Sequence, residues 1–226
     1  MKTIGLIGGI TWKSTKEYYR IINELTANKL GGLHSAAIIL YSFDFHQIKT
    51  SDPSQVEKML IEKARMLENS GAEILLLCVN TLHKHFEAIS RTISIPMIHI
   101  ADAAGRAIAA HNLARIGLLG TQPTMEEDFY IDRLKAKFGF KVLTPKPDER
   151  IVVNAIIFDE LVKGIISQES KAKLVHICQN LVNQGAQGII LGCTELPFLL
   201  DHRDLDIPIF NTVFLQAAAA VDLALN

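Results

Sequence analysis

The chain has few cysteines for its length, and their spacing argues against disulfides and structural metal sites. Its 226 residues include three cysteines, at positions 78, 178 and 193, and no two of them form a C-x-x-C pair. A disulfide framework or a structural zinc site needs more cysteines or a closer spacing. We therefore expect free thiols in a reducing compartment, the cytoplasm, and no bound metal.

An excess of charge of one sign and long apolar runs are also missing. The formal net charge is −1, which provides no electrostatic attraction to nucleic acid or to an anionic membrane surface. No stretch reaches the roughly 18 uninterrupted apolar residues of a membrane-spanning helix. The amino terminus, MKTIGLIGGITWKSTK, contains an apolar run that is too short for a signal peptide, and it lacks a small-residue cleavage site. The sequence thus predicts no nucleic-acid partner and no membrane partner.

What the chain does contain is a regular alternation of short apolar runs with longer helical patterns. In segments such as STKEYYRIINELTANKL and PSQVEKMLIEKARMLENSGA, apolar residues recur at helical spacing. This alternation predicts βαβ units, mainly parallel sheets and therefore an α/β fold. The runs predicted as strands are TIGLIGG, SAAIILYSF, AEILLLCV, IPMIHI, ARIGLLGT, KVLTP, QGIILGC and IPIFNT.

The two halves of the chain resemble each other. Three segments recur in the same order at offsets of 112, 114 and 112 residues: IGLIGGITWKST with IGLLGTQPTMEE, GAEILLLCVNT with GAQGIILGCTE, and IPMIHI with IPIFNT. A nearly constant offset predicts a duplicated unit. We expect two pseudo-symmetric parallel-sheet α/β domains, residues 1–100 plus 209–226 and residues 101–208, with the site in the cleft between them.

Both repeats carry the same predicted helix start. Ser14 followed by Glu17, and Thr124 followed by Glu127, fit the capping-box pattern after a strand and a glycine-containing turn. Helix amino termini favour carboxylates or phosphates, but for either pattern taken alone a good cap without a ligand is the favoured interpretation. GLIGG is not the dinucleotide fingerprint because Ile7 replaces its second glycine, and no Walker motif occurs.

The repeat distinguishes the cysteines at the two predicted strand ends. Aligning the shared Gly-Ala places Val79, and not Cys78, opposite Cys193. Successive side chains of a strand point to opposite faces, so if Cys193 points into the cleft, Val79 points there too and Cys78 points away. We expect Cys78 and Cys178 to be core residues. Cys193 precedes hydroxyl and carboxylate residues at a helix start, which predicts a functional thiol with a lowered pKa.

IGLIGGITWKST, NTLH and LGCTEL, in this order within a duplicated α/β chain, resemble the aspartate/glutamate racemase superfamily. The similarity covers essentially the whole chain and is greatest to the aspartate racemase branch, including bacterial amino-acid racemases of broad specificity. It implies racemisation of a small amino acid or dicarboxylate substrate without a cofactor. One residue of each domain faces the substrate; one removes the α-proton and the other returns a proton to the opposite face. It also implies a homodimer.

The resemblance assigns individual residues by motif. Cys193 matches the acid/base of the second half, and Glu195 matches the carboxylate that orients or deprotonates its thiol. His83 follows the family pattern too, although a histidine at this place in a helix is as often structural. The residues that match substrate-binding positions are Ile10, Asn80, Thr81, Thr121, Thr124, Lys163 and Thr194.

The chain departs from the family pattern at the first acid/base. Val79 stands there, and valine cannot carry a proton. Cys78 could take over only if the strand end twists to present it, whereas Thr81 or a bound water could act as a weak second donor.

A second departure concerns the substrate side chain. Racemases of acidic substrates are expected to carry an arginine after the aspartate of the second strand, where this chain has Phe45 after Asp44. Lys163 could supply a cation instead, or be a surface lysine. Three functions stay open: an amino-acid racemase of aspartate/glutamate type, which is the leading interpretation, a one-cysteine lyase or isomerase acting on a dicarboxylate, and a non-catalytic ligand-binding homologue.

Overall fold

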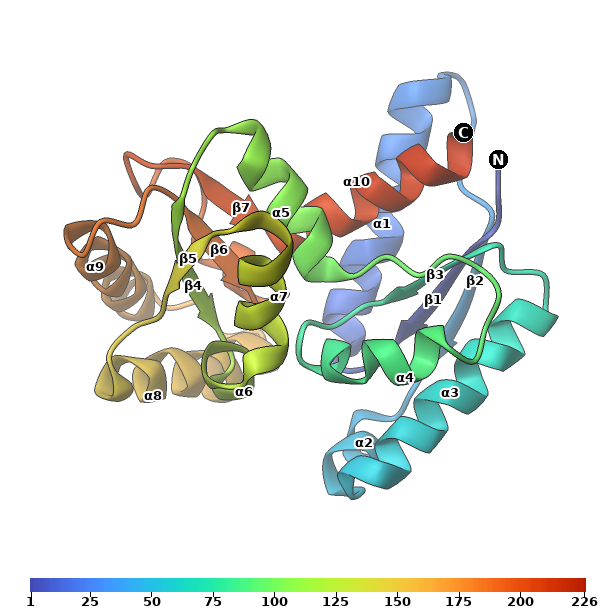
Figure 1. The fold of residues 1–226 in the computed structure, drawn as a ribbon, viewed down its shortest axis with the longest axis horizontal. Helices are drawn as coiled ribbons and strands as arrows, with labels where there is room; N and C mark the ends of the chain where they lie inside the picture. The colour runs from blue at the N-terminus through green and yellow to red at the C-terminus, as the bar shows by residue number, and fades with distance from the viewer. The chain divides into compact units, whose positions relative to one another are not determined.

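The chain, described by a computed structural model over residues 1–226, divides into two compact units. The first unit comprises Met1–Ile100 and Val213–Asn226, and the second comprises Ala101–Thr212. Each unit contains one parallel sheet with helices packed against it (Figure 1). The α/β fold predicted from the alternation of strand and helix patterns is therefore confirmed. None of the helices combines the length and apolar character that crossing a bilayer requires.

The sheet of the first unit has the strand order β2-β1-β3. Its strands are β1 (Ile4–Gly8), β2 (Ile38–Ser42) and β3 (Ile74–Leu77), and all pairs are parallel. Every residue of β1 and β3 is buried, as expected for strands of a parallel sheet covered on both faces. The predicted strand IPMIHI forms only a single bridge, between Leu75 and Met97, because a helix begins at Ile100.

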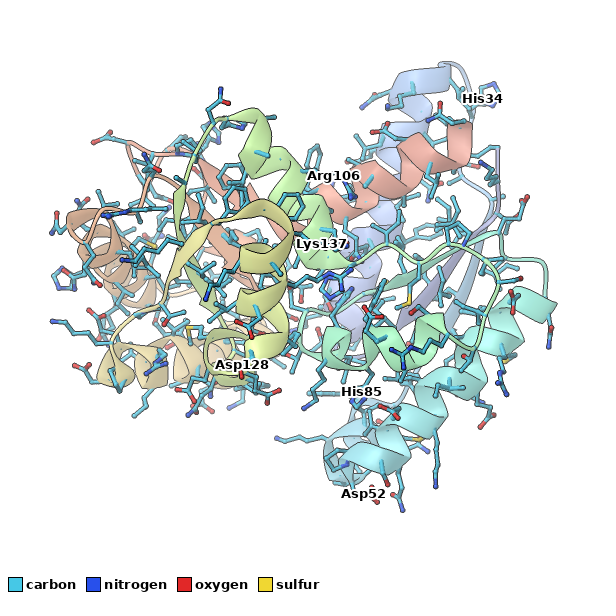
Figure 2. The ribbon with its side chains drawn as sticks, in the orientation of Figure 1. His34, Asp52, His85, Arg106, Asp128 and Lys137 are labelled. Carbon is cyan, nitrogen blue, oxygen red and sulfur yellow. The ribbon has the colours of Figure 1, made fainter.

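Helices of the first unit pack on its sheet and on each other. They are α1 (Trp12–Leu30), α2 (Phe45–Thr50), α3 (Pro53–Asn69), the 3-10 helix η1 (Thr81–His85), α4 (Phe86–Ser90) and, from the end of the chain, α10 (Thr212–Leu225). Asp52, labelled in Figure 2, caps α3 by accepting from the N–H groups of Ser54 and Gln55. Leu75 and Leu77 of β3 pack with Val56 and Leu60 of α3 in what we call the α3 cluster.

The last helix returns to the first unit and lies against α1 (Figure 1). Lys29 of α1 forms an ion pair with Asp222 of α10. The N–H of Lys2 donates to the carbonyl of Ala224 at 2.8 Å. Polar contacts near the carboxyl end of this helix therefore supplement its apolar packing.

The sheet of the second unit has the order β5-β4-β6-β7 and is also parallel. Its strands are β4 (Arg115–Gly120), β5 (Lys141–Leu143), β6 (Ile189–Gly192) and β7 (Ile209–Asn211). Because β7 pairs with β6, residues 209–212 lie in the second unit, whereas the boundaries predicted from the sequence place residue 209 onward in the first domain. Those boundaries otherwise stay a prediction.

The helices of the second unit include a π-helical turn. They are α5 (Ile100–Ala110), which begins at the unit boundary, α6 (Gln122–Glu126), α7 (Asp128–Phe138), α8 (Pro147–Ala155), the π-helix Ile156–Glu160, the 3-10 turns Leu161–Lys163 and Leu196–Phe198, and α9 (Gln168–Asn183). Ile189 and Leu191 of β6 pack with Leu174 and Leu181 of α9 in what we call the α9 cluster.

An ion-pair cluster joins α5 to α7. Arg133 donates through Nε and Nη2 to the two carboxylate oxygens of Asp102, at 2.6 and 2.8 Å. Lys137, labelled on α7 in Figure 2, donates to the same carboxylate at 2.7 Å. Burial by itself raises the pKa of Asp102, but the hydrogen bonds and positive charges of Arg133 and Lys137 outweigh it and lower the pKa below its ordinary value of 3.8.

We expect Asp102→Asn to destabilise the protein by about 1–3 kcal/mol at pH 7, because it removes charge-assisted hydrogen bonds. Since the folded-state pKa is lowered, the contribution of Asp102 is complete above the unfolded pKa near 3.8 and is lost as the pH falls through the folded value. Urea unfolding at pH 7 and at pH 3 measures this. The stability difference between wild type and variant should shrink at the lower pH; an equal difference at both would contradict the assignment.

Candidate active site

In the second unit, close strand pairing brings two loops to one edge of the sheet. Gly120, the last residue of β4, is paired with Gly192, the last residue of β6. A Cβ at Gly192 would lie 2.8 Å from the carbonyl oxygen of Leu119, so the strands approach too closely for a side chain there. The residues that follow, Thr121 and Cys193, consequently emerge at the carboxyl edge, where open α/β sheets bind their ligands.

Cys193, Thr194 and Glu195 form a buried hydrogen-bonded group. Cys193 is 7% exposed and Glu195 is 3% exposed. The Cys193 thiol donates to Oε2 of Glu195 at 3.1 Å, and the Thr194 hydroxyl donates to the same oxygen at 2.6 Å. One carboxylate oxygen thus holds both donors, and the thiol has a base within proton-transfer distance.

The environment of Cys193 favours the protonated thiol. Burial raises the pKa of Cys193 well above its ordinary value, and the negative charge of Glu195 raises it further. The backbone N–H groups of Glu195 and Thr194 donate toward the sulfur and act in the opposite direction. The lowered pKa predicted from the sequence is therefore wrong. The helix that follows is only the 3-10 turn Leu196–Phe198, and burial and the Glu195 carboxylate outweigh the backbone donors of Thr194 and Glu195.

Thr121 and Thr124 lie together at the start of α6. Thr121 is the N-cap residue, and its Oγ1 lies 3.1 Å from Oγ1 of Thr124, which is fully buried. Thr124 packs beneath the paired strand ends, since a Cβ at Gly120 would lie 3.0 Å from its Cβ. Four of the residues matched to the family, Thr121, Thr124, Cys193 and Thr194, therefore follow adjacent strand ends.

The capping boxes predicted at Ser14 and Thr124 are wrong. Thr11 caps α1, with Ser14 inside its first turn and the two hydroxyl oxygens 3.2 Å apart. Thr121 and Thr124 repeat this arrangement. The true caps therefore lie three residues earlier in both halves, and the pattern T-x-x-[ST] after a strand-ending glycine is the signal that identifies them.

In the first unit, the end of β3 presents Val79 and buries Cys78. The N–H of Cys78 donates to the carbonyl of Ile7 at 2.8 Å, and its side chain is fully buried. Burial strongly raises the pKa of this thiol. Val79 packs against the α3 cluster, which contains Leu77 and Leu75, the residues two and four positions before it. Val79 thus continues the face of the strand to which Leu75 and Leu77 belong.

The same alternation governs the second unit. Cys193 belongs to the α9 cluster together with Ile189 and Leu191. The alignment of Val79 with Cys193 therefore pairs two residues that continue the corresponding face of β3 and of β6. Cys178, on α9, is also buried in the α9 cluster, and burial first and the charge of Asp204 second raise its pKa to about 12.

The remaining predicted residues of the first half surround the end of β3. Asn80 is buried and precedes η1, which begins at Thr81. Ile10, which follows β1, packs against the α3 cluster, as Val79 does. His83 is buried, and its ring Nδ1–H donates to the carbonyl of Val79 at 2.8 Å, so it has a structural contact in the turn.

Lys163 has a different environment from the other predicted residues. It ends the 3-10 turn Leu161–Lys163, and its side chain is 59% exposed. Its ammonium lies 3.5 Å from the carboxylate of Asp159, one turn earlier. A surface ion pair is the contact observed for this residue. No group of three or more His, Cys, Asp or Glu side chains in the chain is arranged to hold a metal ion.

Replacing the carboxylate should make Cys193 more acidic. In Glu195→Gln, the charge that helps raise the thiol pKa is gone, so alkylation of Cys193 by iodoacetamide should begin at lower pH than in wild type. Mass spectrometry of the peptide containing residue 193 across a pH series measures this. Cys178, buried on α9, is the internal control, and its alkylation should not shift. An unchanged or higher midpoint for Cys193 would show that Glu195 does not oppose thiolate formation.

Comparison with known proteins identifies the family of the chain. The family model described as Asp/Glu/Hydantoin racemase matches residues 7–221. The broad specificity amino-acid racemase RacX of Bacillus subtilis (strain 168) is 27% identical over 223 residues, which cover 96% of this chain and 96% of RacX.

Two solved structures match this chain over 100% of its length and over 100% of their own. A Yersinia pestis protein provisionally identified as an Asp/Glu racemase is 45% identical, with a TM-score of 0.94. An aspartate racemase homologue from Pyrococcus horikoshii OT3 is 34% identical, with a TM-score of 0.89. Because the family model spans nearly the whole chain and both structures match its fold over their full length, this chain belongs to the Asp/Glu/hydantoin racemase family.

Proposed function

We propose that this protein is a cofactor-independent amino-acid racemase, of aspartate/glutamate type, in which Cys193 moves the α-proton. The observation that carries the proposal is the buried contact of 3.1 Å between the thiol of Cys193 and the carboxylate of Glu195. Family membership supports the general activity, since RacX is described as a broad specificity amino-acid racemase. The three free cysteines suit a reducing cytoplasm.

Proton transfer proceeds in two balanced steps. Glu195 accepts the thiol proton, and the resulting thiolate removes the α-proton of the substrate, which leaves a carbanion and restores the thiol. In the reverse step the thiol returns a proton to the α-carbon, and Glu195 restores the thiol. The backbone N–H groups of Thr194 and Glu195 stabilise the transient thiolate.

The raised pKa of Cys193 suits this chemistry. A buried thiolate that has lost its hydration is a stronger base than an exposed one, and the α-proton of an amino acid is very weakly acidic. Glu195 makes the thiolate accessible by taking its proton locally. In this mechanism Cys193 therefore remains a protonated thiol until the substrate is bound.

The hydroxyl and amide groups at the strand ends are the proposed substrate ligands. Asn80 and Thr81 in the first half, and Thr121, Thr124 and Thr194 in the second, would hold the α-carboxylate and amino group of an amino acid. Ile10 would pack against the substrate. Lys163 would pair with a distal carboxylate only after leaving Asp159, so we do not assign the substrate to the dicarboxylic amino acids alone.

Inversion needs a second proton source, and Val79 cannot provide one. Cys78 is fully buried and its pKa is raised, so its thiol is poorly suited to the task. We propose that water or the Thr81 hydroxyl delivers the second proton. The hydroxide or alkoxide left behind takes a proton from solvent, and Glu195 releases to solvent the proton that it first accepted from Cys193. Exchange of the α-proton should then be fast for the enantiomer that presents it to Cys193 and slow for the other.

A single competent thiol also suits a second activity. A one-cysteine lyase or isomerase would use Cys193 to protonate an enolate formed from a dicarboxylate, with no need for a base at position 79. Release of carbon dioxide from a substituted malonate, together with failure to exchange the α-proton of any amino acid, would favour this activity over racemisation.

The racemase assignment predicts that Cys193→Ala lowers the exchange of α-protons for deuterium by about 10²–10⁴-fold, the usual contribution of a general acid–base group. Proton NMR of each enantiomer of a panel of amino acids in deuterated buffer measures exchange, and chiral chromatography measures inversion. Binding without exchange in wild type, seen by calorimetry, would identify a ligand-binding homologue instead.

Restoring a thiol at position 79 should raise inversion selectively. We expect Val79→Cys to increase racemisation by at least about a hundredfold, because it supplies the second acid/base. Cys78→Ala is the matched control and should change little, since that side chain is buried in the unit core. A folded but inactive Cys78→Ala protein would overturn the assignment of position 79.

A further inference from the structure

A buried hydrogen-bond network connects the last helix to the end of β3 within the first unit. Gln216 of α10 is completely buried. Its side-chain oxygen accepts from the Tyr18 hydroxyl of α1 at 2.5 Å. Its amide nitrogen donates to the carbonyl of Ile98 at 2.7 Å and lies 3.3 Å from Nε2 of His83. The proposed mechanism uses none of these groups.

The network determines which nitrogen of His83 carries the proton. A carbonyl can only accept, so the Ile98 oxygen requires the amide nitrogen of Gln216 on its side. The same nitrogen donates its second hydrogen to Nε2 of His83, which must then be unprotonated. The proton is therefore on Nδ1, and it is donated to the carbonyl of Val79 at 2.8 Å.

His83 holds the turn through two successive carbonyls. Its ring donates to the carbonyl of Val79, and its backbone N–H donates to the carbonyl of Asn80 at 3.0 Å. Both carbonyls belong to the short connection between the end of β3 and the start of η1. The ring itself packs beside His99, with their centroids 4.6 Å apart, and stacks on Phe86. The orientation of the Asn80 and Thr81 backbone thus depends on the ring of His83.

We propose that Gln216 is a positioning residue for the first half of the active site: through His83 it fixes the turn Val79–Asn80–Thr81 that binds the substrate. The role of this turn rests on the proposed function. A buried amide is costly unless its hydrogen bonds are made, and an apolar side chain of similar size would fill the same space. What the amide supplies beyond packing is the donor that sets the His83 tautomer.

The test compares two variants of α10 that both disturb buried side chains. Gln216→Leu removes the amide while keeping an apolar body of similar size, and Val221→Ala trims a fully buried residue five positions further along the helix. Thermal unfolding establishes how far each is destabilised. We expect Gln216→Leu to raise the KM for the enantiomers of aspartate and glutamate by at least about tenfold with a smaller change in kcat. Val221→Ala should leave KM unchanged.

A spectroscopic readout separates this proposal from the proposed function. Nitrogen-15 NMR of the wild-type imidazole should show His83 protonated at Nδ1 only, and Gln216→Leu should abolish this signature and shift the amide resonances of Asn80 and Thr81. If wild type exchanges no α-proton, the racemase assignment fails, while the NMR result still decides whether Gln216 controls the turn.

Two outcomes would overturn the proposal. One is equal KM for Gln216→Leu and Val221→Ala; the other is an unchanged His83 signature with unmoved Asn80 and Thr81 resonances in Gln216→Leu. Should Gln216→Leu fail to fold, Tyr18→Phe removes only the hydroxyl that orients the amide and should produce the same shifts with a smaller rise in KM. Unmoved resonances in a folded Tyr18→Phe protein, with KM at the wild-type value, would then count against the proposal.

Discussion

The proposed site depends on one constraint, the direct parallel pairing of two strands in each unit. These pairs are β1 with β3 in the first unit and β4 with β6 in the second. In the second unit, Gly120 and Gly192 are paired at the strand ends, with too little room for a Cβ between the chains. In the first unit, β1 pairs with β3 in the same way, and Cys78 extends the ladder by donating to Ile7. In each unit, the loops that follow the two paired strands therefore lie at the same carboxyl edge of the sheet.

Duplication preserves this constraint while the chemistry of the halves differs. Both halves bring a hydroxyl pair, Thr11 with Ser14 and Thr121 with Thr124, to a helix start. Only the second half places a thiol and a carboxylate after its strand. Packing explains how such divergence is tolerated: Val79 lies against the α3 cluster, where an aliphatic side chain is stabilised by burial. The fold therefore does not require an ionisable group at position 79.

Much of the fold was predictable because it follows from local pattern. Apolar alternation with helical segments identifies all seven strands and one further segment, IPMIHI, that forms only a bridge. The period of two along a strand assigns Cys78 and Val79 to different faces. The helix caps were missed because the capping-box pattern fits Ser14 with Glu17 and Thr124 with Glu127, three residues after the true caps. Gly9 and Ile10 separate β1 from the cap Thr11, whereas Thr121 follows β4 directly. Gly9, with φ of +90°, takes a conformation that favours glycine, so this longer turn has its own backbone requirement.

Tertiary surroundings decide what the sequence could not. The sequence places Cys193 before a helix, which argues for a lowered pKa, but it does not reveal how deeply the thiol is buried or where the Glu195 carboxylate points. Gln216 is separated from His83 by 133 residues, so no local pattern links them. These two features share a physical logic. In each, burial makes a polar contact costly to break, so one hydrogen bond determines where a proton resides: on the sulfur beside Glu195 and on Nδ1 of His83. The proposed proton transfer uses the first of these placements, and the proposed role of Gln216 depends on the second.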